Sequence, residues 1–203
     1  MVAPASFRWQ STARPIWALL FTLCAGCVGP AFAQDANQEA WAALKAPVAI
    51  VLFRHALAPG GGDPPGLVLG DCTTQRNLST EGREQARRMG DVLRQRGVAV
   101  GAVWHSQWCR THHTAQLAFA DPAGPVPQAQ PAFNSFFASP QAEAAQSEQA
   151  RRLLLGWRGP GTLVVVTHQV NITALTGVVP QSGEGVVLHQ KAGALRVQGK
   201  VLP

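Results

Sequence analysis

The chain has 203 residues, with 17 Lys and Arg against 11 Asp and Glu, which gives a formal net charge of +6 at pH 7. This modest positive charge favours anionic ligands. The basic residues form no stripe interleaved with aromatic side chains, so the composition argues against a nucleic-acid partner.

The first 33 residues have the features of a secretory signal peptide. Arg8 and Arg14 precede an apolar stretch over 16–28, and no acidic residue comes before Asp35. The apolar stretch is shorter than the ~20 residues that span a bilayer. Ala31-Phe32-Ala33 then fits a small-x-small cleavage site.

We therefore expect a signal peptide over 1–33, one domain over 34–203 and a periplasmic or secreted location, with no stable membrane span. Cleavage leaves 170 residues with a net charge of +4, which is enough chain for one domain with a sizeable core. A lipoprotein anchored at Cys27 is the weaker alternative, because residues 23–27 match a lipidation site only loosely.

The first predicted strand carries two polar residues at its carboxyl end. The apolar run over 48–53 is followed by Arg54-His55 and then by the Gly- and Pro-rich stretch 59–66, a pattern that predicts a buried strand closed by a turn. Ligands of open α/β sheets bind at this edge. A guanidinium beside an imidazole suits phosphate chemistry, since one positions an anion and the other can attack it. Solubility is the alternative reason for such residues at a strand end.

The expected mature chain retains two cysteines, Cys72 and Cys109. In an oxidising compartment two such cysteines most simply form a disulfide, which would join the loop after the first strand to the start of a later helix. Metal binding is the weaker alternative because no CxxC spacing is present.

Strand and helix patterns alternate through the rest of the chain. Ser79 is a helix cap, and the apolar residues Ala86, Met89 and Leu93 recur at helical spacing until Gly97. The other expected elements are a strand over 98–104, a helix over 107–120, a proline-rich loop over 121–140, a helix over 141–157, a strand over 162–166 and two short strands over 186–188 and 195–197. The pattern predicts one three-layer α/β/α domain with a mostly parallel central sheet.

Phosphate-competent residues follow three of these strands. Besides Arg54-His55, residues 106–110 with Arg110 begin a helix after the second strand, and His168 follows the strand over 162–166. The carboxyl ends of parallel strands lie at one edge of a sheet, so we expect these residues to meet there.

Together these segments resemble the histidine phosphatase superfamily, which has the phosphoglycerate mutase-like fold. The motifs run across most of residues 48–188. They are Leu52-Phe53-Arg54-His55, Asn77-Leu78-Ser79 with Gly82 and Gln85-Ala86, Ser106 to Arg110 with Thr114-Ala115, and Val165-Val166-Thr167-His168. The family usually has Gly where this chain has Ala56, which narrows the backbone choices at that turn.

The resemblance implies a role for each site residue. His55 would attack phosphorus and become phosphohistidine, while Arg54, Arg110 and His168 hold the phosphate oxygens. The arginines would also favour the uncharged form of His55, because another cation beside them is disfavoured. These cations supply the positive surroundings of a metal, so we expect no cofactor and no metal. His105, His112 and His113 do not converge enough for a metal site.

The proton donor to the leaving group departs from the family pattern. One branch has an acid that by order would fall near residues 133–136, where no carboxylate occurs, and another has Asp where this chain has Gln169. The candidates elsewhere are Asp63, Asp71 and Glu184. We favour Glu184, which precedes a late strand, although a role as a solvated turn residue is an equal alternative.

The sequence thus predicts an exported phosphomonoesterase that acts on a small-molecule phosphate ester. A phosphoramidate phosphatase is an alternative, because its leaving group depends less on protonation by an acid. A phosphate-binding module without catalysis is another. Two retained histidines favour the enzyme, whereas export and the missing acid argue against a mutase. The sequence specifies neither the natural substrate nor an oligomeric state.

Overall fold

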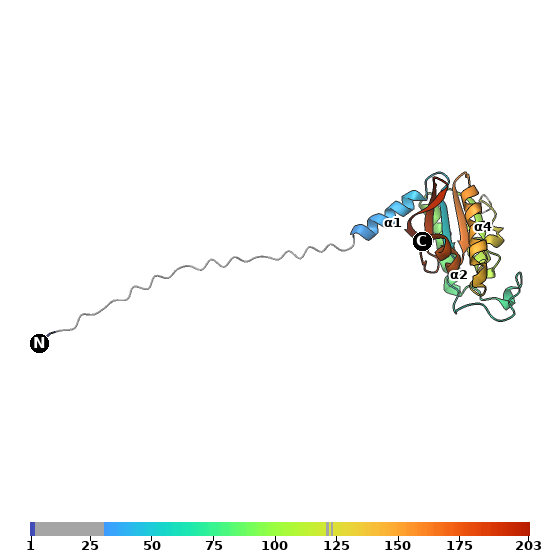
Figure 1. The fold of residues 1–203 in the computed structure, drawn as a ribbon, viewed down its shortest axis with the longest axis horizontal. Helices are drawn as coiled ribbons and strands as arrows, with labels where there is room; N and C mark the ends of the chain where they lie inside the picture. Colours follow the sequence, from blue (N-terminus) through green and yellow to red (C-terminus); the bar gives the residue numbers. More distant parts are fainter. Residues whose placement is uncertain (3–30, 121, 123) are drawn as a thin grey trace.

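A six-stranded sheet forms the centre of the fold in the computed structural model, which describes residues 1–2, 31–120, 122 and 124–203 (Figure 1). The strand order is β3-β2-β4-β1-β5-β6. The first four strands in this order pair in parallel, whereas β5 pairs antiparallel with both of its neighbours. The strands are β1 Ile50–Arg54, β2 Val100–His105, β3 Gln128–Ala129, β4 Thr162–Thr167, β5 Gly185–Lys191 and β6 Ala194–Val201.

Helices cover both faces of the sheet, which confirms the predicted three-layer α/β/α architecture. Figure 1 shows α1 and α4 on opposite sides of the strands. One face packs against α1 (Ala31–Ala43), α2 (Thr80–Gln95) and α3 (Cys109–Phe119), and the other against α4 (Glu143–Gly156) and α5 (Gln169–Thr176). Short 3₁₀ helices occur at η1 (Cys72–Thr74), η2 (Pro131–Phe133) and η3 (Pro140–Ala142).

Strand β1 shows why this chain forms a buried parallel sheet. Val51 and Phe53 belong to the core cluster under α1, α2 and α3, and Ile50 and Leu52 belong to the cluster under α4 and α5. All four side chains are fully buried. A strand covered on both faces is apolar throughout, so the sequence here shows a continuous run and no alternation.

Helix α2 holds the loop that follows β1. Ser79 caps the helix by accepting a hydrogen bond from Gly82 N at 3.1 Å, and Ser79 N donates to Leu57 O. A Cβ on Gly82 would lie 2.0 Å from Leu57 O, so only glycine permits this close approach. Gln85 then accepts from Leu57 N and donates to Ser182 O, which ties two loops at the edge of the sheet together.

Two helices and one short strand were not predicted. They are α1, α5 and β3, and the last two lie beside the carboxyl edge of the sheet. Most of the expected leader, Cys27 included, falls outside the described residues, and the predicted cleavage site after Ala33 falls in the first turn of α1. None of the helices in the described part of the chain is both long and apolar enough to cross a membrane.

Candidate active site

The carboxyl ends of β1, β4 and β2 bring the predicted residues to one place. His55 N donates to Thr167 O at 2.9 Å, and Ser106 N donates to Val166 O at 3.1 Å, so the segments that follow the three strands lie side by side. Arg110 belongs to the first turn of α3, directly after the second of these segments. Parallel pairing therefore assembles one site from three distant parts of the sequence.

Around these residues is a cleft of about 160 Å³. All four residues expected to act on phosphate line it. The lining residues are Arg54, His55, Gly60, Gly61, Gly62, Asp63, Arg76, Arg110, Ser135, Phe137, His168, Gln169 and Val170.

The His55 ring is held in a defined orientation and kept uncharged. Its Nδ1 lies 2.7 Å from Ala56 O, and because a carbonyl only accepts, Nδ1 carries the proton. Nε2 of the neutral ring then has the free lone pair. Burial lowers the pKa of His55 to about 3, with Arg110, Arg76 and Arg54 acting in the same direction and the bond to Ala56 opposing them. At neutral pH the His55 ring is thus uncharged, with the lone pair of Nε2 unprotonated.

His168 lies beside His55, with ring centroids 5.6 Å apart and planes at 67°. Its Nε2 is 2.8 Å from Ser106 Oγ, and its Nδ1 is a buried atom without a hydrogen-bond partner among the described residues. Burial above all, and then Arg110, hold the pKa of His168 well below its usual value. The bond to Ser106 Oγ therefore orients a neutral ring beside His55.

Three arginines surround the two rings. Arg54 donates to Pro180 O at 3.1 Å, and Arg110 forms a two-pronged ion pair with Asp63. Arg76 was not predicted, and its Nη1 donates to Ala58 O and Gly60 O. In the described chain, each of the three has a buried Nε without a hydrogen-bond partner.

Buried donors without partners are uncommon in folded proteins, and here they gather around one cleft. Among the described residues eight buried side-chain atoms have no partner, and four of them are nitrogens of residues that line the cleft: Arg54 Nε, Arg76 Nε, Arg110 Nε and His168 Nδ1. An oxyanion with several acceptor oxygens would satisfy such donors. The site therefore has the chemistry of a phosphate pocket.

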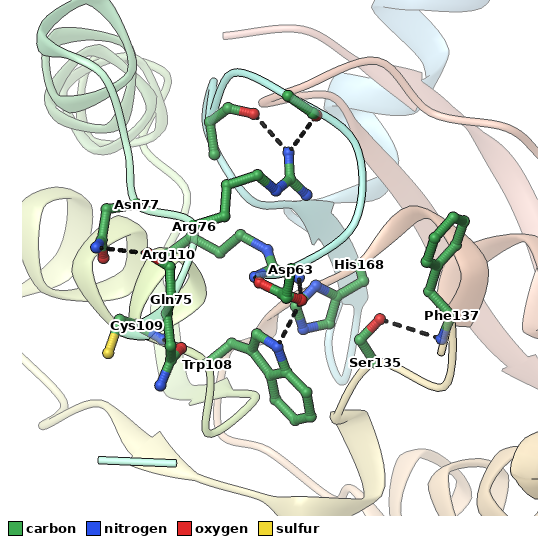
Figure 2. A network of polar contacts seen from close by, with 12 residues as sticks. Asp63, Gln75, Arg76, Asn77, Trp108, Cys109, Arg110, Ser135, Phe137 and His168 are labelled. Carbon is green, nitrogen blue, oxygen red and sulfur yellow. Dashed lines mark hydrogen bonds and ion pairs between the residues drawn. The ribbon is translucent and has the colours of Figure 1, made fainter. Parts of the chain in front are cut away.

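Asp63 extends into this cationic cleft (Figure 2). Its Oδ1 lies 2.6 Å from Arg110 Nη1, and its Oδ2 accepts from Arg110 Nη2 at 3.1 Å and from Trp108 Nε1 at 3.0 Å. Burial raises the pKa of Asp63, but the hydrogen bonds and charge of Arg110 outweigh it, and the net shift is downward. Without a ligand Asp63 is an ionised partner of Arg110.

Glu184, which we favoured as the proton donor, occupies a different environment. Its Oε1 lies 2.8 Å from Lys200 Nζ, and its Oε2 accepts from Gln181 N at 2.8 Å. Its side chain is buried and is not part of the cleft lining, although Glu184 O accepts from Arg54 N. The Glu184 carboxylate thus stabilises the loop before β5. Asp71, the third candidate, caps η1 at the surface.

The disulfide expected between Cys72 and Cys109 is present, with the two Cα atoms 5.7 Å apart. It joins η1 to the first residue of α3, directly before Arg110. Gln75, on the other side of η1, accepts from Cys109 N at 2.9 Å. The bond therefore holds two cationic residues of the cleft, Arg76 and Arg110, on segments that are covalently linked.

The remaining histidines lie outside the cleft. His105 and His112 approach at 3.4 Å between ring nitrogens, and the rings of His112 and His113 lie 5.7 Å apart. In the described part of the chain, no group of three or more His, Cys, Asp and Glu side chains is arranged to hold a metal ion.

A second hollow of about 450 Å³ continues from the cleft. It shares Phe137, Gln169 and Val170 with the cleft and is otherwise lined by Phe136, Pro140, Glu143, Thr173 and Ala174. Apolar side chains predominate, and Glu143 is the one charged residue of the lining. The cleft therefore opens into a largely apolar hollow.

Comparisons with known proteins agree with this fold. The model of the histidine phosphatase superfamily (branch 1) matches residues 50–136. Among solved structures, Bacillus stearothermophilus YhfR aligns with a TM-score of 0.58 at 14% identity, over 73% of this chain and 94% of its own. Entamoeba histolytica phosphoserine phosphatase, solved with 3-phosphoglyceric acid, gives a TM-score of 0.56 at 14% identity over 75% and 95%.

A mycobacterial glucosyl-3-phosphoglycerate phosphatase, solved with VO3, gives a TM-score of 0.55 at 18% identity over 75% of this chain and 97% of its own. At such identities the likeness concerns the fold. No curated protein matches the sequence significantly.

The fold is thus that of an α/β protein with an anion site at the carboxyl edge of its sheet. The matched segment over 50–136 resembles the histidine phosphatase superfamily (branch 1), and the fold is the one that the aligned structures share.

Proposed function

We propose that this protein is a phosphatase that hydrolyses a small-molecule phosphate ester through a phosphohistidine formed on His55. The observation that carries the proposal is the 2.7 Å bond from His55 Nδ1 to Ala56 O, which leaves Nε2 unprotonated, beside four buried donors that have no partner among the described residues. An anion-binding module would need the donors but would not need a buried histidine kept neutral among arginines.

The chemistry proceeds in two displacements. Nε2 of His55 attacks phosphorus as the bond from phosphorus to the leaving-group oxygen breaks, and water then attacks the phosphohistidine and releases phosphate. Phosphoryl transfer has a transition state with charge spread over the non-bridging oxygens, so it is accelerated mainly by positioning and electrostatics. Arg54, Arg76, Arg110 and His168 supply both. The cations that surround the phosphate take the place of a metal in this proposal.

The related folds support a small organic phosphate as substrate, because two of the aligned proteins are phosphatases named for phosphoserine and for glucosyl-3-phosphoglycerate. The hollow beside the cleft offers apolar contacts to the leaving group. Export by the leader expected at residues 1–33 is part of the proposal and would direct the enzyme to substrates outside the cytoplasm.

The test is covalent labelling. The purified protein, mixed with an aryl phosphate carrying radiolabelled phosphorus and quenched under denaturing alkaline conditions, should bear the label on His55. Hydrolysis of para-nitrophenyl phosphate should persist in EDTA. A His55→Ala protein should neither take up label nor turn over, whereas the control His189→Ala, whose ring bonds to Ala43 O away from the cleft, should do both. Equal labelling of the His55→Ala protein would refute the proposal.

A further inference from the structure

We propose that Asp63 is the general acid and base of this active site, protonating the leaving group and then activating the water that cleaves the phosphohistidine. The inference rests on the proposed function of His55. Of the described residues that line the cleft, Asp63 is the one that carries a carboxylate.

The geometry of Arg110 lets Asp63 and a phosphate bind at the same time. A guanidinium has five N–H donors, and Asp63 takes one from each Nη of Arg110. Nε is buried without a partner among the residues described, so this edge of the guanidinium lacks an acceptor that a phosphate oxygen would supply. A phosphate on that edge lies next to the carboxyl group without displacing it.

The conformation of the loop that carries Asp63 places its side chain in the cleft. Gly60 and Gly62 have positive φ values of 93° and 69°, which other residues rarely adopt. Arg76 Nη1 donates to Gly60 O at 2.9 Å, and Trp108 Nε1 binds Asp63 itself. Trp108 and Arg110 therefore hold the carboxyl group, and Arg76 holds the loop that carries it.

Substrate binding supplies the proton affinity that the free site lacks. The pKa of Asp63 is low because Arg110 compensates for burial, which alone raises it. A bound phosphate shares the charge of Arg110 and adds negative charge beside the carboxylate, and both effects raise the pKa. The protonated carboxyl group is thereby formed in the enzyme–substrate complex.

The proton balance closes over one cycle. His55 Nε2 bonds to phosphorus as the bond from phosphorus to the leaving-group oxygen breaks. The Asp63 proton passes to that oxygen in the same step. The resulting carboxylate then accepts a proton from water as the water oxygen attacks phosphorus and the bond to Nε2 breaks. Phosphate leaves, and Asp63 is protonated again for the next ester.

The test compares two leaving groups in the Asp63→Asn protein. Phenyl phosphate has a poor leaving group that needs protonation, whereas para-nitrophenyl phosphate has a good one. We expect the pre-steady-state release of phenol to slow by about 10² to 10³-fold, the range of general acid catalysis, and that of para-nitrophenol to change less than tenfold. Labelled phosphohistidine should accumulate with para-nitrophenyl phosphate, because water attack has lost its base.

Two controls separate the alternatives. Asp71→Asn, in the same segment but outside the cleft, should behave as wild type, and Asp63→Glu should recover part of the phenyl phosphate rate. Equal slowing of phenol and para-nitrophenol release would overturn the inference and show that Asp63 only supports Arg110. Equal acceleration of both would also overturn it, because Asp63 would then compete with phosphate for Arg110. A wild-type protein without label on His55 would refute the proposed function instead.

Discussion

At the scale of single residues, the three arginines of the cleft differ in what else they bind. Arg54 donates to a backbone carbonyl and Arg76 to two of them, whereas Arg110 is paired with a carboxylate and is almost fully buried. A buried guanidinium with a fixed partner is pre-organised, so little reorganisation accompanies phosphate binding. Arg110 is therefore the arginine whose removal should reduce turnover most.

We expect Arg110→Ala to lower kcat for para-nitrophenyl phosphate by about 10² to 10³-fold, by analogy with the loss of one pre-organised oxyanion donor. Steady-state kinetics would measure the effect. Arg152→Ala, which removes an exposed arginine paired with Glu148 on α4, is the control and should leave kcat unchanged. A wild-type kcat in the Arg110→Ala protein would exclude Arg110 from the transition state.

Residues at strand ends were predictable, and residues in loops were not. His55 and His168 follow apolar runs, so their place at the edge of the sheet follows from the strand alone. Asp63 and Arg76 lie in a segment without periodicity, and their positions depend on the glycine turns and on the disulfide. The sequence favours Glu184 over Asp63 as proton donor because Glu184 precedes a late strand. The ion pair of Glu184 with Lys200 depends on the pairing of β5 with β6, which the sequence does not specify.

At the scale of elements, helices α2 and α4 were predicted to within about two residues at each end. Ser79 caps α2, and the Gly-Pro-Gly stretch over 159–161 follows α4. Helix α5 has eight residues and includes Val170, Ile172 and two threonines, all of which are poor helix formers. Packing of Ile172 and Asn171 against the fold stabilises it. The left-handed Gly177 at its end was the one signal that the sequence offered.

The disulfide between Cys72 and Cys109 links the stability of the fold to the geometry of the site. It closes a loop with a sequence separation of 37, which by loop entropy stabilises the fold by about 4 kcal/mol. The Cys72→Ser, Cys109→Ser double variant should lose free energy of unfolding of that order in urea titrations. It should also raise KM, because Arg76 follows η1 closely and Arg110 lies in the first turn of α3. An unchanged KM together with the full loss of stability would show that backbone hydrogen bonds alone hold the two arginines.

At the scale of the whole molecule, the buried polar groups of the site lower the stability of the fold, and the rest of the fold compensates for them. In the described part of the chain, the cleft gathers neutral histidines, guanidinium nitrogens without partners and the ion pair of Arg110 with Asp63. Apolar clusters on both faces of the sheet supply the stability. Such concentration of buried polar groups is typical of catalytic sites, where pre-organisation is favoured over stability. The same arrangement makes the stability of the whole domain depend on pH.

Acid should therefore destabilise the protein well above the pKa of its folded histidines. An unfolded histidine has a pKa near 6.5, and His55 in the fold has a pKa of about 3. Between these values the unfolded chain binds more protons, so the free energy of unfolding decreases as the pH falls through this window. His168 shifts in the same direction and adds to the decrease.

For His55 alone, the decrease from pH 7 to pH 5 amounts to about 2 kcal/mol. Urea titrations at the two pH values would measure it, and the His55→Gln protein, whose side chain cannot be protonated, should show a decrease smaller by about that amount. Equal pH dependence of the two proteins would mean that the His55 ring is solvated enough to be charged in the folded state. The arginine cage would then be open to water, and a neutral nucleophile would no longer follow from burial.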